Sequence, residues 1–99
     1  MNIPENMIPI ILCSGANGRC VQFGWVESFP KPGEAVLLHN ARMVLYWPAA
    51  CGGLLGLAAN GPKDGLKLTA AVTKSATTCH DVVEVSKDAA EQLFVWRSV

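Results

Sequence analysis

The chain has 99 residues, which is enough for one hydrophobic core, and we predict a single domain over residues 1–99. Apolar residues make up 51% of the sequence and charged residues only 16%. This composition excludes a disordered chain, and it predicts a homo-oligomer or another partner that covers apolar surface. Lys and Arg total 8, as do Asp and Glu, so no excess of positive charge indicates binding to extended nucleic acid.

The four cysteines do not follow the spacing of zinc ligands, so we expect no metal site and no cofactor. The N-terminal residues lack the basic and long apolar regions of a signal peptide, and no apolar run reaches membrane-spanning length. We therefore expect a cytoplasmic protein with reduced thiols and no membrane contact. A hairpin disulfide between Cys13 and Cys20 is the alternative for that pair.

The first third of the chain predicts a hairpin of two strands, at residues 7–13 and 19–27, joined by a turn at residues 14–18 that contains Asn-Gly. The second strand alternates, and its aromatic face is expected to point inward. That face carries Val21, Phe23 and Trp25. The loop at residues 29–33 contains two prolines, and we expect Phe29 to fold back over the core.

Two further strands are predicted at residues 34–39 and 42–47, with a tight connection at Asn40-Ala41. The strand at residues 42–47 is largely apolar on both faces, which is typical of a central strand or of one covered by a partner. A short helix is expected at residues 54–59, where Leu and Ala dominate and Asn60-Gly61-Pro62 follows as a stop signal.

The last third predicts a weaker strand at residues 66–72, a loop at 73–78 and a valine-rich strand at 79–85. Ser86 is the expected N-cap of an amphipathic helix over residues 87–97. The predicted fold class is therefore mainly β (α+β): a small, bent antiparallel sheet or barrel with a short middle helix and a C-terminal helix.

No residue pattern indicates catalysis, and we expect no enzyme activity. His39 and His80 have no recognisable nucleophile motif near them, and neighbours such as Cys79 and His80 point to opposite faces of a strand. The same alternation separates Asp81 from Glu84. The competing class is a hydrolase that uses His80 with one of these two carboxylates.

A second group of residues resembles a site for a nucleotide-like ligand, because arginine pairs with phosphate, aromatic rings stack on bases, and glycine before a helix offers N–H groups to anions. The candidate ligand-binding residues are Arg42, Tyr46, Trp47, Gly52, Gly53, Asn60 and Lys63. The competing interpretation is an aromatic core plug with a snorkelling arginine, and glycines that only permit a bend.

From residue 41 to residue 62 the chain resembles a group of small proteins encoded by tailed phages and prophages. The shared pattern is Ala-Arg, an apolar run ending in Trp, a Gly-Leu step, Leu-Ala, two residues and Gly-Pro. Here the pattern is carried by Ala41-Arg42, Val44 to Trp47, Gly53-Leu54, Leu57-Ala58 and Gly61-Pro62. The link at residues 48–51 departs from the pattern, which usually has Gly or Thr there.

The resemblance implies a phage accessory protein in the cytoplasm of the bacterial host, and it supplies no catalytic residue. By analogy with small oligomeric phage proteins, we expect a homo-oligomeric sponge that sequesters a nucleotide-type immune signal of the host. The alternative is a protein-binding inhibitor of a host factor, or a minor phage structural protein.

Overall fold

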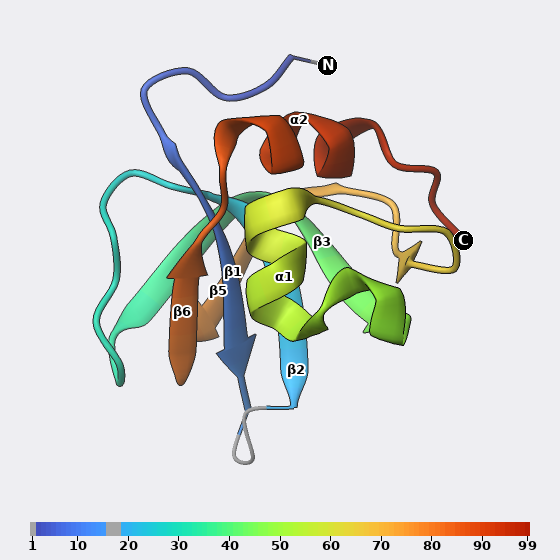
Figure 1. The fold of residues 1–99 in the computed structure, drawn as a ribbon. Coiled ribbons are helices and arrows are strands. Elements are labelled where there is room, and N and C mark those ends of the chain that lie inside the picture. The colour runs from blue at the N-terminus through green and yellow to red at the C-terminus, as the bar shows by residue number, and fades with distance from the viewer. Residues whose placement is uncertain (1, 16–18) are drawn as a thin grey trace.

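The structure is a computed structural model, and it describes residues 2–15 and 19–99 (Figure 1). Most of the predicted turn at residues 14–18 lies outside the described residues. The strands are β1 (Ile8–Ser14), β2 (Cys20–Val26), β3 (Ala35–Tyr46), β4 (Lys67–Leu68), β5 (Val72–Thr78) and β6 (Asp81–Glu84). The helices are the 3-10 turn η1 (Ala49–Cys51), α1 (Gly53–Asn60) and α2 (Lys87–Val95).

The strands form one antiparallel sheet in the order β4-β3-β2-β1-β6, and β5 also pairs with β3. The β1–β2 hairpin runs in register from Ile8↔Val26 to Ser14↔Cys20. Helix α1 is the predicted short middle helix and α2 is the predicted C-terminal helix. The predicted fold class, a mainly β protein with a bent antiparallel sheet and two helices, is confirmed.

Strand β3 is a continuous strand of 12 residues, so the predicted chain reversal at Asn40-Ala41 is wrong. Asn40 has a φ of 52°, and the β2–β3 register shifts between Phe23 and Trp25. The residue in the left-handed region therefore makes a β-bulge, which bends β3 without turning it back. Opposite the bulge, a Cβ on Gly24 would lie 2.6 Å from Leu38 Cγ, so only glycine allows this close approach.

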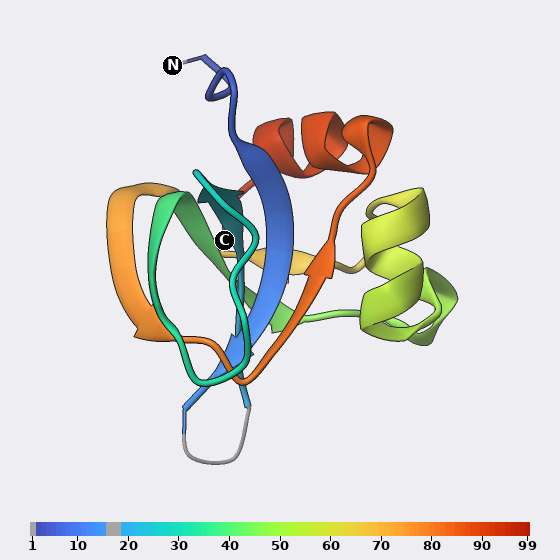
Figure 2. The same cartoon turned by 90° about the vertical axis from the view of Figure 1, so that its left-hand side faces the viewer.

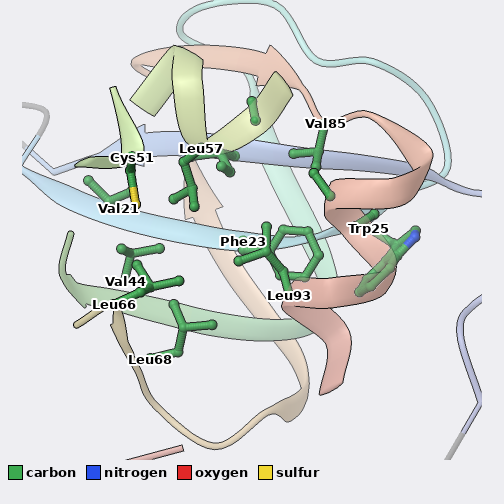
Figure 3. Packing of buried hydrophobic residues seen from close by; sticks show 14 residues of the cluster. Val21, Phe23, Trp25, Val44, Cys51, Leu57, Leu66, Leu68, Val85 and Leu93 are labelled. Atoms are coloured by element: carbon green, nitrogen blue, oxygen red, sulfur yellow. The ribbon is translucent and has the colours of Figure 1, made fainter. Parts of the chain in front are cut away.

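The bend in β3 lets the sheet bury both of its faces. In Figure 2 the first half of β3 and β5 lie on one side of β1, and the two helices lie on the other side. The core under the helices includes the predicted inward face of β2 (Figure 3). Its fully buried members include Phe23, Leu57, Leu68 and Leu93. A second cluster, with Ile10, Leu12, Val36 and Leu38, fills the opposite face.

Phe23 and Trp25 are buried as predicted, whereas Phe29 is not. Trp25 packs edge-on against Phe23 and Phe94, with ring centroids 4.8 Å and 5.7 Å apart. Trp96 is half-buried, and its indole N–H donates to the carbonyl of Leu66 at 3.0 Å. Phe29 is 46% exposed, so the prediction that it covers the core is wrong.

The last third of the chain departs from prediction in its strands. The expected strand at residues 66–72 shrinks to the two residues of β4, whereas the expected loop at 73–78 is β5. Strand β5 pairs with β3 from Ala35↔Thr78 to Ala41↔Val72, because its valine and threonine residues favour a strand and β3 offers an edge to pair with. Helix α2 begins as predicted, because Ser86 Oγ accepts a hydrogen bond from the Ala89 N–H at 3.2 Å.

Across the residues that the structure describes, no helix is long and apolar enough to cross a membrane.

Candidate functional site

Arg42, the first of the predicted ligand-binding residues, lies inside the protein. It is 4% exposed. Its Nε donates to the carbonyl of Thr69 at 2.8 Å and its Nη1 to that of Leu93 at 2.7 Å. Burial lowers the pKa of the guanidinium from its ordinary value. The predicted phosphate contact needs an accessible side chain, whereas this one ties β3 to the segment after β4 and to the last turn of α2.

The other predicted ligand-binding residues are spread over the end of β3, both ends of α1 and the segment after it. Tyr46 is exposed at the end of β3, while Trp47 packs against the core under the helices. Gly52 and Gly53 lie at the start of α1, with φ of 79° and 73°. The Gly52 N–H already donates to the Ala49 carbonyl at 3.0 Å.

The two remaining predicted residues lie beyond the helix. Asn60 is the last residue of α1, and Lys63 follows it in an exposed connection. With a rise of about 1.5 Å per residue, α1 holds Asn60 roughly 10 Å from the glycines at its start. Residues that are close in sequence are therefore separated by the length of a helix.

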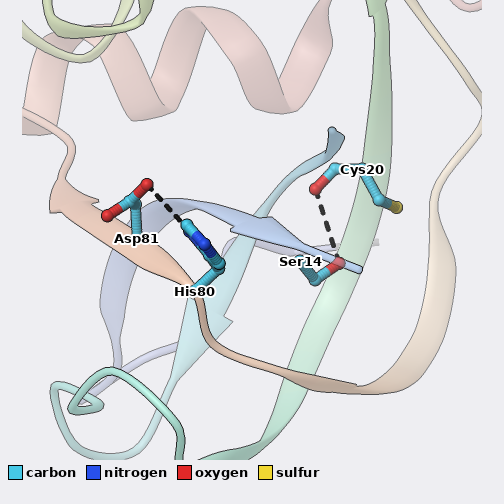
Figure 4. A network of polar contacts seen from close by, with 4 residues as sticks. All are labelled: Ser14, Cys20, His80 and Asp81. Carbon is cyan, nitrogen blue, oxygen red and sulfur yellow. Dashed lines mark hydrogen bonds and ion pairs between the residues drawn. The ribbon is translucent and has the colours of Figure 1, made fainter. Parts of the chain in front are cut away.

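The hairpin end of the sheet brings together Cys13, Cys79 and His80. His80 Nδ1 lies 3.0 Å from Asp81 Oδ2, and both side chains are largely exposed (Figure 4). Beside them, burial and then the carboxylate of Asp81 raise the pKa values of the Cys13 and Cys79 thiols. The geometry therefore pairs His80 with Asp81, and the raised pKa values of the two thiols disfavour the thiolate that would act as a nucleophile.

Cys13 and Cys20 are free thiols on opposite faces of the hairpin. Cys13 pairs with Val21, and Cys20 pairs with Ser14, whose Oγ also donates to the Cys20 carbonyl at 3.4 Å (Figure 4). Adjacent residues of a strand point to opposite sides, so the two sulfur atoms face away from each other. Within residues 2–15 and 19–99, no group of three or more His, Cys, Asp or Glu is placed to hold a metal ion.

An apolar groove lies between α1 and β6. Two cavities, of about 310 Å³ and 240 Å³, adjoin each other there and share Leu55 and Val83. Leu55 is 71% exposed, although it belongs to a helix that buries Leu57 and Ala58 against the sheet. The first cavity is also lined by Ala58, Ala59, Glu84, Val85 and Ser86, and the second by Ile11, Cys13, Leu54, Asp81 and Val82.

The position of α1 beside β6 follows from close backbone contacts. A Cβ on Gly56 would lie 2.0 Å from the carbonyl oxygen of Cys51, so glycine is required where α1 crosses η1. At the other end of α1, Ser86 Oγ donates to the Ala59 carbonyl at 3.0 Å. The Ser86 N–H also donates to the Ala58 carbonyl, at 2.8 Å. These contacts fix the helix and thereby the width of the groove.

Strand β6 presents an open edge along this groove. Among the described residues, its one partner strand is β1, from Ile10↔Glu84 to Cys13↔Asp81. The Val85 N–H donates to the Pro9 carbonyl at 2.9 Å, and hydrogen-bonding direction alternates along a strand. The backbone groups of Val83 therefore point to β1, and those of Val82 and Glu84 point outward.

The electrostatic character of the groove is acidic. The only charged residues lining its two cavities are Asp81 and Glu84. An added strand would meet Val83 and Asp81 on the α1 side of the sheet, and Val82 and Glu84 on the opposite side. The arrangement can thus offer backbone hydrogen bonds, an apolar groove and two carboxylates to an extended chain.

Sequence reasoning missed this groove. It predicted both the short helix and the valine-rich strand, but it treated Asp81 and Glu84 only as candidate catalytic acids. The available signal was Leu55, an extra leucine in a helix whose Leu57 and Ala58 suffice to cover the sheet. The packing of this helix beside β6 could not be predicted from the sequence.

Comparison with known proteins gives a family but no described relative. No curated protein and no solved structure matches the chain. The family described as a domain of unknown function, DUF6948, matches residues 7–93. Because this match spans most of the 99 residues, the chain belongs to the DUF6948 family.

Proposed function

We propose that this protein acts by binding, without turnover, and that its ligand is an extended segment of a protein partner that adds to β6 as a further strand. The observation that supports this proposal is the coincidence of an open strand edge with an apolar groove beside it. In the phage setting that the sequence resemblance implies, the partner is a host protein in the bacterial cytoplasm, and occupation of its segment inhibits it.

Strand addition accounts for both affinity and selectivity. The outward backbone groups of Val82 and Glu84 supply main-chain hydrogen bonds, which are largely independent of sequence. Selectivity comes from the side chains of the added strand. Every second side chain lies in the groove beside Leu55, and the side chains between them lie on the opposite face of the sheet, near Glu84. The preferred segment therefore has apolar residues at every second position and Lys or Arg between them.

The nucleotide-sponge function has weaker support. Its phosphate-pairing residue, Arg42, is buried and already donates to two backbone carbonyls. Its aromatic and glycine residues lie at separate places along β3 and α1. Protein binding, the alternative class, uses features that are adjacent in space.

The test is binding of a labelled peptide in which valine and lysine alternate, measured by fluorescence anisotropy, with an alternating valine–glutamate peptide as control. Leu55→Ser should weaken binding about 10- to 100-fold, because it removes a buried leucine contact. Leu37→Ser is the matched control, since Leu37 is 48% exposed on β3, away from the groove. Equal loss of affinity in both variants, or equal binding of both peptides, would refute the proposal.

Amide hydrogen exchange provides an independent readout. The bound lysine peptide should slow exchange at Val82 and Glu84, because their N–H groups face outward. A nucleotide panel in a thermal-shift assay tests the competing function in parallel. Stabilisation by a nucleotide, with no peptide protection at β6, would favour the sponge instead.

A further inference from the structure

Strand β5 is the longest open strand edge among the described residues, and it is separate from the α1–β6 groove. Six of its seven residues pair with β3, its one partner strand among the described residues, and no register shift interrupts the pairing. The edge of β4 is covered by the C-terminal segment, since the Val99 N–H donates to the Leu68 carbonyl at 2.9 Å. Strand β6 has four residues, against seven in β5.

The outward groups of β5 can be assigned from one hydrogen bond. The Cys79 N–H donates to the Glu34 carbonyl at 2.9 Å, which extends the register of the β3–β5 pair by one step. Because bonding direction alternates, Ser75 and Thr77 point their backbone groups to β3. The N–H and C=O groups of Val72, Lys74, Ala76 and Thr78 point outward.

Strand β5 has few of the sequence features that usually prevent an exposed edge from pairing with another strand. The strand has no proline, and its only charged residue is Lys74. Lys74 lines a cleft of about 260 Å³ together with Glu27 and Glu34, so its charge has carboxylates nearby. A regular, weakly charged edge of this length is a template for another strand.

We propose that two copies of this chain form a dimer by antiparallel pairing of their β5 edges across a two-fold axis at Ala76. In this register Ala76 faces the partner's Ala76, and Lys74 faces the partner's Thr78. Three of the four outward residues of each copy, all except Val72, are then paired, with about six intermolecular hydrogen bonds. Lysine does not oppose lysine, and the formal net charge of zero keeps long-range repulsion low.

A second copy fits this edge better than an unrelated peptide does. The strand consists mostly of Thr, Ser and Ala, which give little side-chain selectivity for a foreign sequence. In the proposed register, Ser75 lies beside the partner's Thr77, and hydroxyl-bearing pairs of this kind are favourable across strands. The dimer leaves both α1–β6 grooves open, because β5 and β6 lie on different sides of the molecule (Figure 2).

Site-directed crosslinking tests the register. In an Ala76→Cys variant, the two new thiols lie opposite each other at a Cα separation of about 5.5 Å, which a disulfide spans. A covalent dimer should form under mild oxidation. Lys74→Cys is the matched control on the same edge, because its two thiols would lie several residues apart. The wild-type chain, oxidised in parallel, reports any crosslink made by the four native cysteines.

Sedimentation velocity tests the dimer itself. The wild-type protein should sediment as a species of twice the 10.6 kDa chain mass at about 100 µM. Ala76→Pro should shift it to monomer while circular dichroism stays unchanged, since this N–H is not used within the chain. A wild-type monomer at that concentration, or equal crosslinking of Lys74→Cys and Ala76→Cys, would overturn the proposal.

Discussion

Replacement of Arg42 by methionine distinguishes a structural arginine from a ligand-binding one. Methionine keeps much of the apolar stem but removes both donors. The carbonyls of Thr69 and Leu93, which accept at 2.8 Å and 2.7 Å, would then lose their partner inside the protein. We expect the variant to be strongly destabilised in the absence of any ligand.

The size of the effect follows from the contacts. A hydrogen bond to a charged group contributes about 1.5–3 kcal/mol, and a buried group left without its partner costs a similar amount. Because Arg42 makes two such bonds and is 4% exposed, we expect a loss of about 3–5 kcal/mol in the free energy of unfolding. Small domains have only about 5–15 kcal/mol in total, so Arg42→Met should lie close to the limit of folding.

The assay is urea unfolding followed by tryptophan fluorescence. With a slope of about 1–3 kcal/mol per molar urea, the midpoint should fall by roughly 1–5 M in Arg42→Met. Arg42→Lys should fall between this variant and the wild type, because lysine keeps a charge but lacks the fork of donors. Arg97→Met is the control, since Arg97 is exposed just after α2. An unchanged midpoint in Arg42→Met would refute the structural role and restore Arg42 as a candidate ligand residue.

Three further predictions concern the bulge, the helix cap and a buried thiol. Gly24→Ala should cost about 1–3 kcal/mol in urea unfolding, because its Cβ would lie 2.6 Å from Leu38 Cγ; a neutral effect would contradict the close approach. Ser86→Ala should cost about 1–2 kcal/mol, since it removes both the cap of α2 and the bond to the Ala59 carbonyl. A melting temperature equal to that of wild type would show that neither bond matters. Burial raises the pKa of the Cys79 thiol, so its contribution to stability is complete below about pH 8.5, the usual thiol range, and declines above it. Cys79→Ala should flatten the alkaline fall in unfolding free energy, and an unchanged slope would argue against a buried, protonated thiol.

The elements that could be predicted from the sequence are those whose cause is local. Alternation of Val21, Phe23 and Trp25 identifies β2 and its buried face. Ser86 identifies the start of α2, because a hydroxyl before an amphipathic run caps the first N–H groups of a helix. In each case the residues that decide the structure lie within a few positions of one another.

The failures occur where the cause is distant in the sequence. Asn40 favours the left-handed backbone of a turn, but the same conformation makes a bulge when Gly24 opposite it gives room to Leu38. The polar sequence of β5 resembles a loop, and it becomes a strand because the straight first half of β3 leaves an edge to pair with. The role of Gly24 opposite Asn40, and that of β3 beside β5, could be recognised only once the register of β2, β3 and β5 was known.

Arg42 shows the same limit for the candidate site. An arginine on an apolar strand face indicates either a ligand or a buried hydrogen-bond acceptor. The acceptors of Arg42 are the carbonyls of Thr69 and Leu93, which lie 27 and 51 residues further along the chain. The contact with Leu93 has a physical reason. Helix α2 has no basic residue in its last turn, so the cation that complements its C-terminal carbonyls comes from β3. Ser86 holds the first turn of α2 to α1, and Arg42 holds its last turn to the sheet. The α1 wall of the α1–β6 groove is thus fixed by the contacts of Ser86, and their loss should loosen the proposed binding as well as lower stability.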